Sequence, residues 1–281
     1  MICQYYAEEN LHSIQKTMDI GIRATVLISL LFTTLGMALA GFLPLLFGVQ
    51  SEQMIAETEA AVRCFLLFIV FLGCTLMYSN YYIYIEKRNY GAVLKVLLLL
   101  GFPYVGMEMG ARCSMNEMWL GTGAGFVLAY VFNLWWSGSK GKLFLDKEKL
   151  ARQYSYDVDC TMEKVVALSR QVVEDMAVAD ITPQQRNLLT VLVEEIGTHA
   201  SRRAADKPFQ MEFSILLGKE AASALTLIVR DNGTPYDIIK TAQQGKFNYQ
   251  DYFIESITVN CLRRVYLASG DENRMILRIG A

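Results

Sequence analysis

Two short polar clusters have residue types and spacings that could carry chemistry. The first is Val193-Glu-Glu-Ile-Gly-Thr-His199, in which Glu195 and His199 are four residues apart and so lie on one face of a helix. A carboxylate and an imidazole placed in this way could act together on one group. Taken alone, the cluster is better interpreted as a solvated helix end with an ordinary ion pair, because such pairs are common on helices.

The second cluster is Asp231-Asn-Gly-Thr-Pro-Tyr-Asp237. It follows a run with the composition of a strand, and its glycine and proline stand at positions typical of a tight turn. By itself it indicates a turn after a strand. The order of the elements around both clusters changes that interpretation.

The elements that would hold these clusters follow from hydrophobic spacing. Apolar residues at helical spacing predict a helix over Thr161–Ala179 and a second helix from Thr182, where a capping hydroxyl precedes a proline. Further apolar runs predict strands at Met211–Ile215, Leu225–Val229 and Arg274–Ile279, and a helix at Phe253–Val265. We expect an α/β sandwich with helices on one face of a mixed, mainly antiparallel sheet.

This order resembles the GHKL ATPase superfamily, most closely its anti-sigma-factor, serine-kinase-like branch. In that branch a capped helix carries Glu-Glu-x-x-x-Asn, and a loop two strands later reads Asp-Asn-Gly-x-Pro-Phe. Glu194 and Glu195 match the helix motif, and Asp231-Asn-Gly-Thr-Pro-Tyr236 matches the loop closely. The stretch from Tyr266 to Leu277 resembles the final hairpin of the branch. The resemblance covers residues 155–279 and implies a histidine-kinase-like ATPase fold.

The resemblance implies a role for each matched residue. Asp231 would accept the amino group of adenine, and Gly233 would let the backbone approach the base because it has no side chain. Glu195 would be the catalytic carboxylate that orients or activates the attacking group, with Glu194 beside it in the nucleotide site. His199 stands where the family has the asparagine that holds Mg²⁺. The implied cofactors are ATP and Mg²⁺.

Two departures from the family pattern predict weak or absent ATP turnover. Magnesium prefers oxygen ligands, so the imidazole of His199 is a poor replacement for an asparagine amide. The stretch that matches the nucleotide lid, Lys240–Asp251, has one glycine, whereas the family wraps the phosphates with glycine backbone N–H groups. Lys240 and Lys246 could partly replace that cradle. We therefore expect a serine/threonine-kinase-like or ATPase domain with degenerate metal and lid motifs.

The N-terminal half has a different composition. Residues 1–144 contain 18 charged residues and residues 145–281 contain 36. Four apolar segments are of about the length that spans a bilayer and lack the polar face of a soluble bundle; they are Ala24–Val49, Ala60–Ile85, Gly91–Met107 and Met118–Trp136. We expect a four-helix transmembrane domain over residues 1–138, a linker over 139–152 and the ATPase-like domain over 153–281.

Most lysines and arginines of the short connecting segments lie before the first span, between the second and third, and after the fourth, whereas the other two loops are mainly acidic. This bias predicts a multi-pass protein of the bacterial inner (plasma) membrane with both termini in the cytoplasm. The net charge of −2 offers no bulk attraction to nucleic acid, so none is expected as a partner. The six cysteines form no CxxC pair and are interpreted as small buried hydrophobes rather than metal ligands.

The run from Phe42 to Trp136 resembles the last four helices of a MATE-type (multidrug and toxin extrusion) transporter. The similar residues are Phe42-Leu-Pro-Leu-Leu-Phe47, the helix end Met77-Tyr-Ser-Asn-Tyr-Tyr82, and Phe132-Asn-Leu-Trp-Trp136. The resemblance implies that about two thirds of such a transporter is missing, so this segment would be an anchor, a sensor or half of an assembly.

Three functions stay open. The first is a membrane-tethered regulator with an ATP-binding, anti-sigma-like domain. The second is a non-catalytic version of that fold, which holds a protein partner such as a sigma factor or an anti-anti-sigma-like protein. The third is a partial MATE-family transporter with an accessory nucleotide-binding domain. A homo-oligomer is compatible with each of them.

Overall fold

The chain divides into two units, Met1–Asp146 and Lys147–Ala281, in the computed structural model. The structure describes residues 2–139, 143, 145–204, 209–218, 223–237, 249–269 and 272–280, with the backbone alone for 139, 147, 249–251 and 269.

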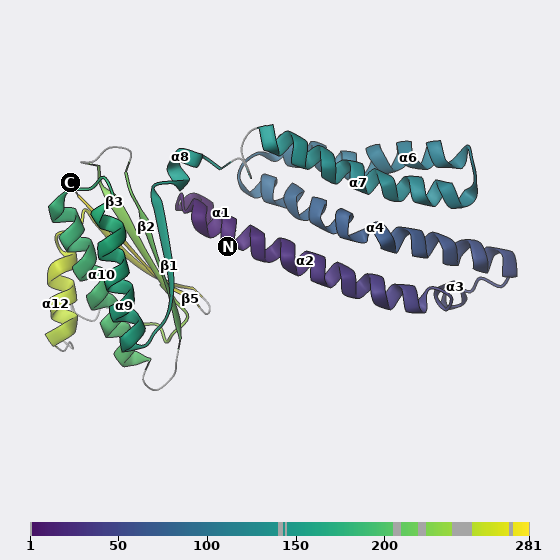
Figure 1. Ribbon diagram of the computed structural model, residues 1–281. Coiled ribbons are helices and arrows are strands. Elements are labelled where there is room, and N and C mark those ends of the chain that lie inside the picture. The colour runs from purple at the N-terminus through teal and green to yellow at the C-terminus, as the bar shows by residue number, and fades with distance from the viewer. Residues whose placement is uncertain are drawn as a thin grey trace. The chain divides into compact units, whose positions relative to one another are not determined.

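Helices make up the first unit (Figure 1). They are α1 (Ile2–Ala7), α2 (Leu11–Leu39), α3 (Leu43–Leu46), α4 (Glu52–Tyr84), α5 (Arg88–Val96), a turn of π-helix η1 (Leu97–Gly101), α6 (Phe102–Ala111) and α7 (Met115–Ser139). Within the described residues, four stretches are long and apolar enough to cross a membrane: Leu11–Leu39, Glu52–Tyr84, Arg88–Ala111 and Met115–Gly138. The predicted set of four apolar helices of spanning length is confirmed.

The first of these helices has different ends from those predicted. α2 begins at Leu11 rather than at Ala24, because Asn10 caps it: its Oδ1 accepts a hydrogen bond of 3.1 Å from the N–H of Ser13. The helix ends at Leu39, and Pro44 lies in the first turn of the separate short helix α3. A proline is tolerated there because its missing N–H would have no partner within the helix.

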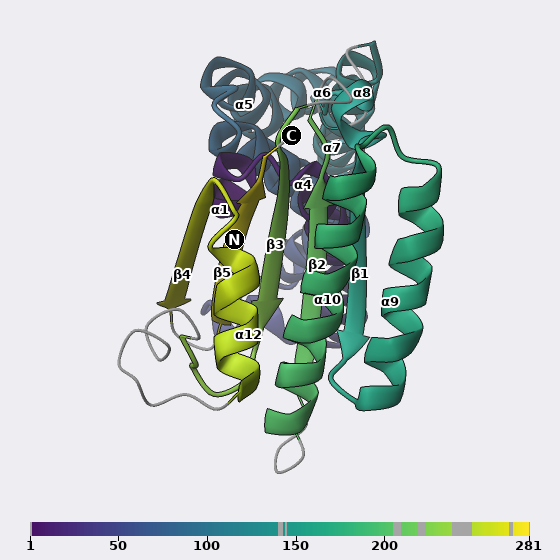
Figure 2. The same cartoon turned by 90° about the vertical axis from the view of Figure 1, so that its left-hand side faces the viewer.

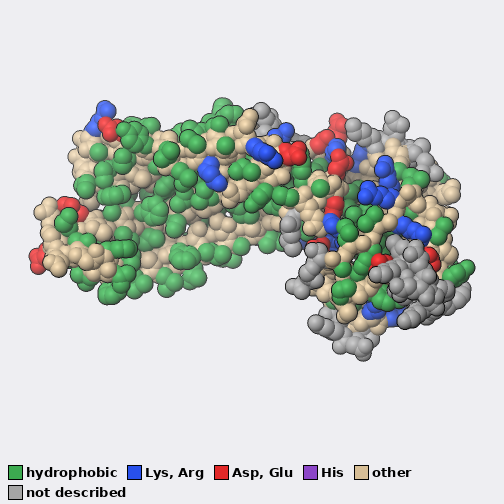
Figure 3. All heavy atoms as spheres, turned by 180° about the vertical axis from the view of Figure 1, so that it is seen from behind, with side chains coloured by type: hydrophobic (Ala, Val, Ile, Leu, Met, Phe, Trp, Pro, Cys, Tyr) green, Lys and Arg blue, Asp and Glu red, His purple; other side chains and the backbone are tan. Residues whose placement is uncertain are grey.

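The surface of the first unit is apolar. Figure 3 shows hydrophobic side chains spread over the face in view, with few charged groups among them. Large side chains that a soluble protein would bury are exposed here, such as Leu27 (68%), Phe32 (60%) and Trp135 (72%). An exposed apolar surface of this extent indicates contact with lipid rather than with water.

The second unit is a five-stranded sheet with helices on one face (Figure 2). Its elements are α8 (Lys147–Leu150), β1 (Gln153–Asp159), α9 (Met162–Ala177), α10 (Pro183–Arg203), β2 (Gln210–Leu216), β3 (Leu225–Asp231), α12 (Tyr249–Thr258), β4 (Arg263–Ser269) and β5 (Glu272–Ile279). The strand order is β1-β2-β3-β5-β4. All four pairings between the described strands are antiparallel. The prediction of a mixed sheet is therefore wrong for these strands.

Most of the predicted elements of this unit are confirmed, including the three strands and the capped helix. Thr182 accepts a hydrogen bond from the N–H of Gln185, whose side chain accepts one from the N–H of Thr182. The helix expected to reach Val265 is wrong at its end. The N–H of Leu262 donates to the carbonyl of Arg278 at 2.7 Å, and from Arg263 the chain pairs with β5 as strand β4.

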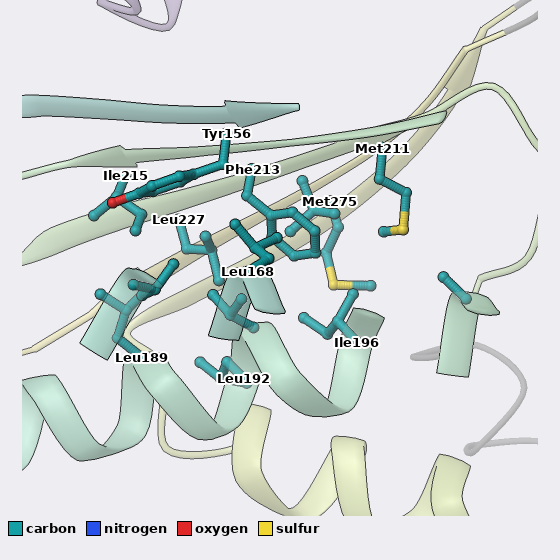
Figure 4. Packing of buried hydrophobic residues seen from close by; sticks show 14 of the residues in the cluster. Tyr156, Leu168, Leu189, Leu192, Ile196, Met211, Phe213, Ile215, Leu227 and Met275 are labelled. Atoms are coloured by element: carbon teal, nitrogen blue, oxygen red, sulfur yellow. The ribbon is translucent and has the colours of Figure 1, made fainter. Parts of the chain in front are cut away.

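The core of the second unit lies between the sheet and the helices. Side chains of α9 and α10 point towards those of the strands in Figure 4; the labelled residues are Tyr156, Leu168, Leu189, Leu192, Ile196, Met211, Phe213, Ile215, Leu227 and Met275. Burying each large apolar side chain contributes about 1.5–3 kcal/mol. This packing holds the last turns of α10 against the end of β3.

The predicted nucleotide lid lies largely outside the residues that the structure describes. Of Lys240–Asp251, residues 240–248 lie outside the described part of the chain, and the side chains of 249–251 do as well. The backbone of Tyr249 onwards forms the start of α12.

Candidate functional site

A small pocket lies where the last turns of α10 meet the end of β3. It is lined by Ile196, His199, Ala200, Arg203, Met211, Val229, Asp231, Tyr236, Tyr266 and Met275. Two of the five predicted site residues, Asp231 and His199, are thus brought together on its wall. The open space is about 20 Å³, which is roughly the room that one water molecule needs.

Asp231 is held by donors of the chain itself. Its Oδ1 accepts hydrogen bonds from the N–H of Gly233 at 2.9 Å and from Nδ2 of Asn273 at 2.8 Å. Its Oδ2 lies 3.9 Å from Nη2 of Arg203, and its side chain is 12% exposed. The acceptor that the family resemblance assigns to adenine is therefore already engaged within the fold.

Asn273 organises the loop after β3, and no sequence pattern singled it out. It is 2% exposed and lies opposite Asp231 in the register of β3 and β5. Its Nδ2 also donates to the carbonyl of Gly233 at 2.8 Å, and its Oδ1 accepts from the hydroxyl of Tyr266 at 3.2 Å. That hydroxyl accepts from the N–H of Tyr236 at 2.8 Å. Only the strand register, which the sequence does not state, could have indicated this contact.

Gly233 is required by packing inside the fold. A Cβ at this position would lie 2.9 Å from a ring carbon of Phe209, closer than carbon atoms normally approach. The absence of a side chain therefore makes room for the ring. The expected role of Gly233 in the approach of a base stays a prediction.

His199 is buried at the pocket wall. It is 6% exposed, and its ring centre lies 5.1 Å from that of Tyr236 with an angle of 35° between the planes. Among the described residues, no group of three or more His, Cys, Asp or Glu side chains could hold a metal ion. The predicted role of His199 in holding Mg²⁺ stays a prediction.

The two glutamates of the helix motif lie elsewhere. Glu194 is exposed and Glu195 is half-buried, and neither belongs to the pocket lining. The stripe of α10 that faces the pocket contains Ile196, His199 and Arg203 instead. The catalytic role assigned to Glu195 stays a prediction.

Arg203 also lines the pocket, and the sequence did not single it out. Its guanidinium carbon lies 5.1 Å from the ring centre of Tyr236 and 5.6 Å from that of Phe209, within the range of cation–π attraction. Its Nη1 donates to the carbonyl of Thr234 at 3.1 Å. Its position in the sequence could have indicated this, because Arg203 follows His199 by four residues and so lies on the same face of α10.

Tyr266, on the pocket wall, and the buried Cys160 stay protonated at neutral pH. Burial raises the pKa of Tyr266 above its ordinary value, and the hydrogen bond from the N–H of Tyr236 opposes this in part. Burial raises the pKa of Cys160 to about 11, with a smaller opposing effect of Arg203. Because a thiol reacts as its thiolate, Cys160 is not an activated nucleophile.

No protein-family model matches the chain, and a search of curated proteins finds no matching sequence. A functional interpretation of the pocket therefore depends on its geometry and on the motif resemblance.

Proposed function

We propose that the protein is a membrane-tethered regulator whose second unit faces the cytoplasm, binds an adenine nucleotide and is degenerate in catalysis. The observation that carries the proposal is the carboxylate of Asp231 in a pocket that also contains the rings of Tyr236 and His199. A carboxylate can accept the amino group of adenine, and aromatic faces can stack on the base.

Binding without efficient turnover is the version that the geometry favours. Glu195, the expected catalytic carboxylate, does not line the pocket. Since the open space is about 20 Å³, an adenine ring enters only if Tyr236 or Arg203 moves. That rearrangement would reduce the affinity for the nucleotide.

The test is isothermal titration of the full-length protein in detergent with ATP, adenosine and inorganic phosphate. Asp231→Asn should weaken binding of ATP and adenosine alike by about tenfold. The substitution replaces one of the two acceptor oxygens of the carboxylate by an NH₂ group, which only donates. Asp180→Asn removes the same charge at an exposed turn and should bind as the parent does. Absence of binding at millimolar ATP would exclude the proposal.

The metal question has its own matched pair of variants. His199→Asn restores the oxygen ligand of the family pattern and should increase the affinity for ATP in the presence of Mg²⁺ but not in its absence. His12→Asn changes the other histidine of the chain, in α2, and should leave both affinities unchanged. Equal affinities for all three proteins would mean that His199 does not stand in for a metal ligand.

A second candidate is a non-catalytic domain that holds a protein partner, such as a sigma factor or an anti-anti-sigma-like protein. The observation that favours it is the contact of Arg203 with both Asp231 (3.9 Å) and the ring of Tyr236 (5.1 Å), which leaves about 20 Å³ of open space in the pocket. Arg203→Met separates the two candidates. It should increase adenosine affinity if the pocket accepts a base once Asp231 is released, and it should produce no adenosine binding if the pocket is purely structural.

A further inference from the structure

The sheet of the second unit carries two pairs of arginines on the face that its helices leave open. The register places Arg230 of β3 opposite Arg274 of β5, and Arg263 of β4 opposite Arg278 of β5. Like charges directly opposed across two strands repel one another. Each pair therefore needs negative charge nearby.

The fold supplies that charge for one pair. Nη1 of Arg230 lies 3.3 Å from Oε2 of Glu212, and its Nε lies 3.3 Å from Oε1 of Glu272, with the arginine side chain 4% exposed. Arg263 and Arg278 are exposed, and no ion pair within the described residues holds either of them. Among the described residues this second pair has no acidic partner, so it is open to an external anion.

The uncompensated pair lies at the end of the sheet that follows the linker. Gln153, Leu216, Thr226, Arg278 and Arg263 form one row across the five strands, which we call the linker row. Gln153 is the first residue of β1, so this row is where the sheet joins the rest of the chain. Neighbouring strands are about 4.8 Å apart, which puts Arg263 about 19 Å from Gln153.

The covalent connection limits how far the linker row can lie from the bilayer. α7 ends at Ser139 and β1 begins at Gln153, and the residues between them reach at most about 45 Å when fully extended. They include five lysines and arginines against two acidic residues. Leu262, next to Arg263, is 69% exposed and adds an apolar side chain at the same end.

We propose that the linker row docks on the anionic phospholipid headgroups of the membrane that contains the first unit. Arg263 and Arg278 bind lipid phosphates, which supply the missing negative charge, and Leu262 enters the headgroup boundary. Guanidinium groups bind phosphate with two parallel hydrogen bonds, and basic side chains near an anionic leaflet are attracted to it. Asp180 also lies at this end of the unit, in the turn between α9 and α10. Because these helices cover the other face of the sheet, its negative charge lies on the side away from the two arginines. This docking does not depend on a nucleotide.

The test is hydrogen exchange of the full-length protein in nanodiscs of neutral phosphatidylcholine and of a mixture with anionic phosphatidylglycerol. Amides of Leu262–Leu267 should exchange more slowly in the anionic discs. Arg263→Gln with Arg278→Gln should remove the difference, since each arginine contributes roughly fivefold to binding and the pair about 25-fold. The matched control, Arg170→Gln with Arg202→Gln, removes two exposed arginines of α9 and α10 and should keep the slow exchange.

Further arms separate other occupants of the linker row. Unchanged exchange of β3 amides shows that a variant is folded, and raising the salt from about 0.05 to 0.5 M should abolish the protection in the parent. Inorganic phosphate added to neutral discs should not reproduce it. Equal exchange in neutral and anionic discs, protection by free phosphate, or protection only in discs that contain two copies would each overturn the proposal.

Discussion

Asp231 has two hydrogen-bond donors and one cation of its own, and any ligand has to compete with them. Asn273 and the N–H of Gly233 share Oδ1, and Arg203 lies beside Oδ2. In a site that is 12% exposed, replacing one of these donors costs the desolvation of that donor. Asp231, whose motif indicates ligand binding in the sequence, therefore has a structural role in the fold unless a ligand displaces one of these partners.

Asn273→Ala should lower the stability of the second unit by about 2 kcal/mol, because it leaves the acceptors of Asp231 and Gly233 and the hydroxyl of Tyr266 without their buried partner. Denaturant unfolding of the full-length protein, followed by hydrogen exchange of β3 amides, measures the loss. Asn260→Ala, at an exposed turn, should change stability by less than about 0.5 kcal/mol. Equal stability of the two variants would mean that Asn273 does not hold the loop.

Secondary structure could be predicted where one local signal was enough. Thr182 with Pro183 marked the start of α10, and the apolar runs at 211–215 and 225–229 marked β2 and β3. The pocket could not be predicted in the same way. Asn273 and Tyr266 reach Asp231 through strand register, and Arg203 reaches it through the position of α10 on the sheet, both of which are set by long-range packing.

Tyr156 ties strand β1 to helix α9, since its hydroxyl donates to Oδ2 of Asp175 at 2.7 Å. Tyr156→Phe should lower the stability of the second unit by about 1.5 kcal/mol at neutral pH, as expected for a hydrogen bond to a charged acceptor. Tyr154→Phe, on the same strand, is the matched control and should have little effect.

The contribution of Tyr156 should also depend on pH. Burial, and then the hydrogen bond and charge of Asp175, hold the pKa of Tyr156 far above its ordinary value of 10.0. The fold thus favours the protonated phenol, so its stabilisation is complete below pH 10 and decreases as the pH rises further. The stability of the parent should fall more steeply above pH 10 than that of Tyr156→Phe. Parallel curves would contradict this assignment.

Helices α6 and α7 pack through glycines spaced four residues apart on each helix. A Cβ on Gly121 would meet the carbonyl oxygen of Gly106 at 2.0 Å, and one on Gly110 would meet that of Glu117 at 2.1 Å. Such close contact of backbones is typical of small residues between membrane helices.

Gly121→Ala should therefore separate the two helices at a cost of about 1–3 kcal/mol. Gly138→Ala, where a Cβ meets nothing within 4 Å, should not. Thermal unfolding of the two purified variants in the same detergent compares them. A parent-like melting temperature for Gly121→Ala would show that the helices can shift without loss.

At the scale of the molecule, the two units are built for different surroundings. The first exposes large apolar side chains, whereas the second gathers its own into a core between sheet and helices. The charged residues, 18 in residues 1–144 and 36 in residues 145–281, follow the same division. One chain with both compositions requires a boundary between lipid and water, and which side of the membrane the second unit faces decides which nucleotides and partners it can meet.

The positive-inside bias predicts that the second unit faces the cytoplasm, and two native cysteines can test this prediction. Both Cys3 and Cys113 are exposed, so the expectation that all six cysteines are buried is wrong for these two. Cys3 lies near the start of the chain, and Cys113 lies between the third and fourth spans. With both termini cytoplasmic, a membrane-impermeant maleimide should label Cys113 in intact cells and Cys3 only after the membrane is permeabilised.

Labelling should be run at mildly alkaline pH, because the hydrogen bond to the Glu117 carboxylate raises the pKa of the Cys113 thiol and reduces its reactive fraction. Cys3→Ser and Cys113→Ser identify the source of each signal. Labelling of Cys3 in intact cells would place the N-terminus outside, and with four spans it would place the second unit there as well. That outcome would deprive the pocket of cytoplasmic ATP and exclude the proposed nucleotide-binding role.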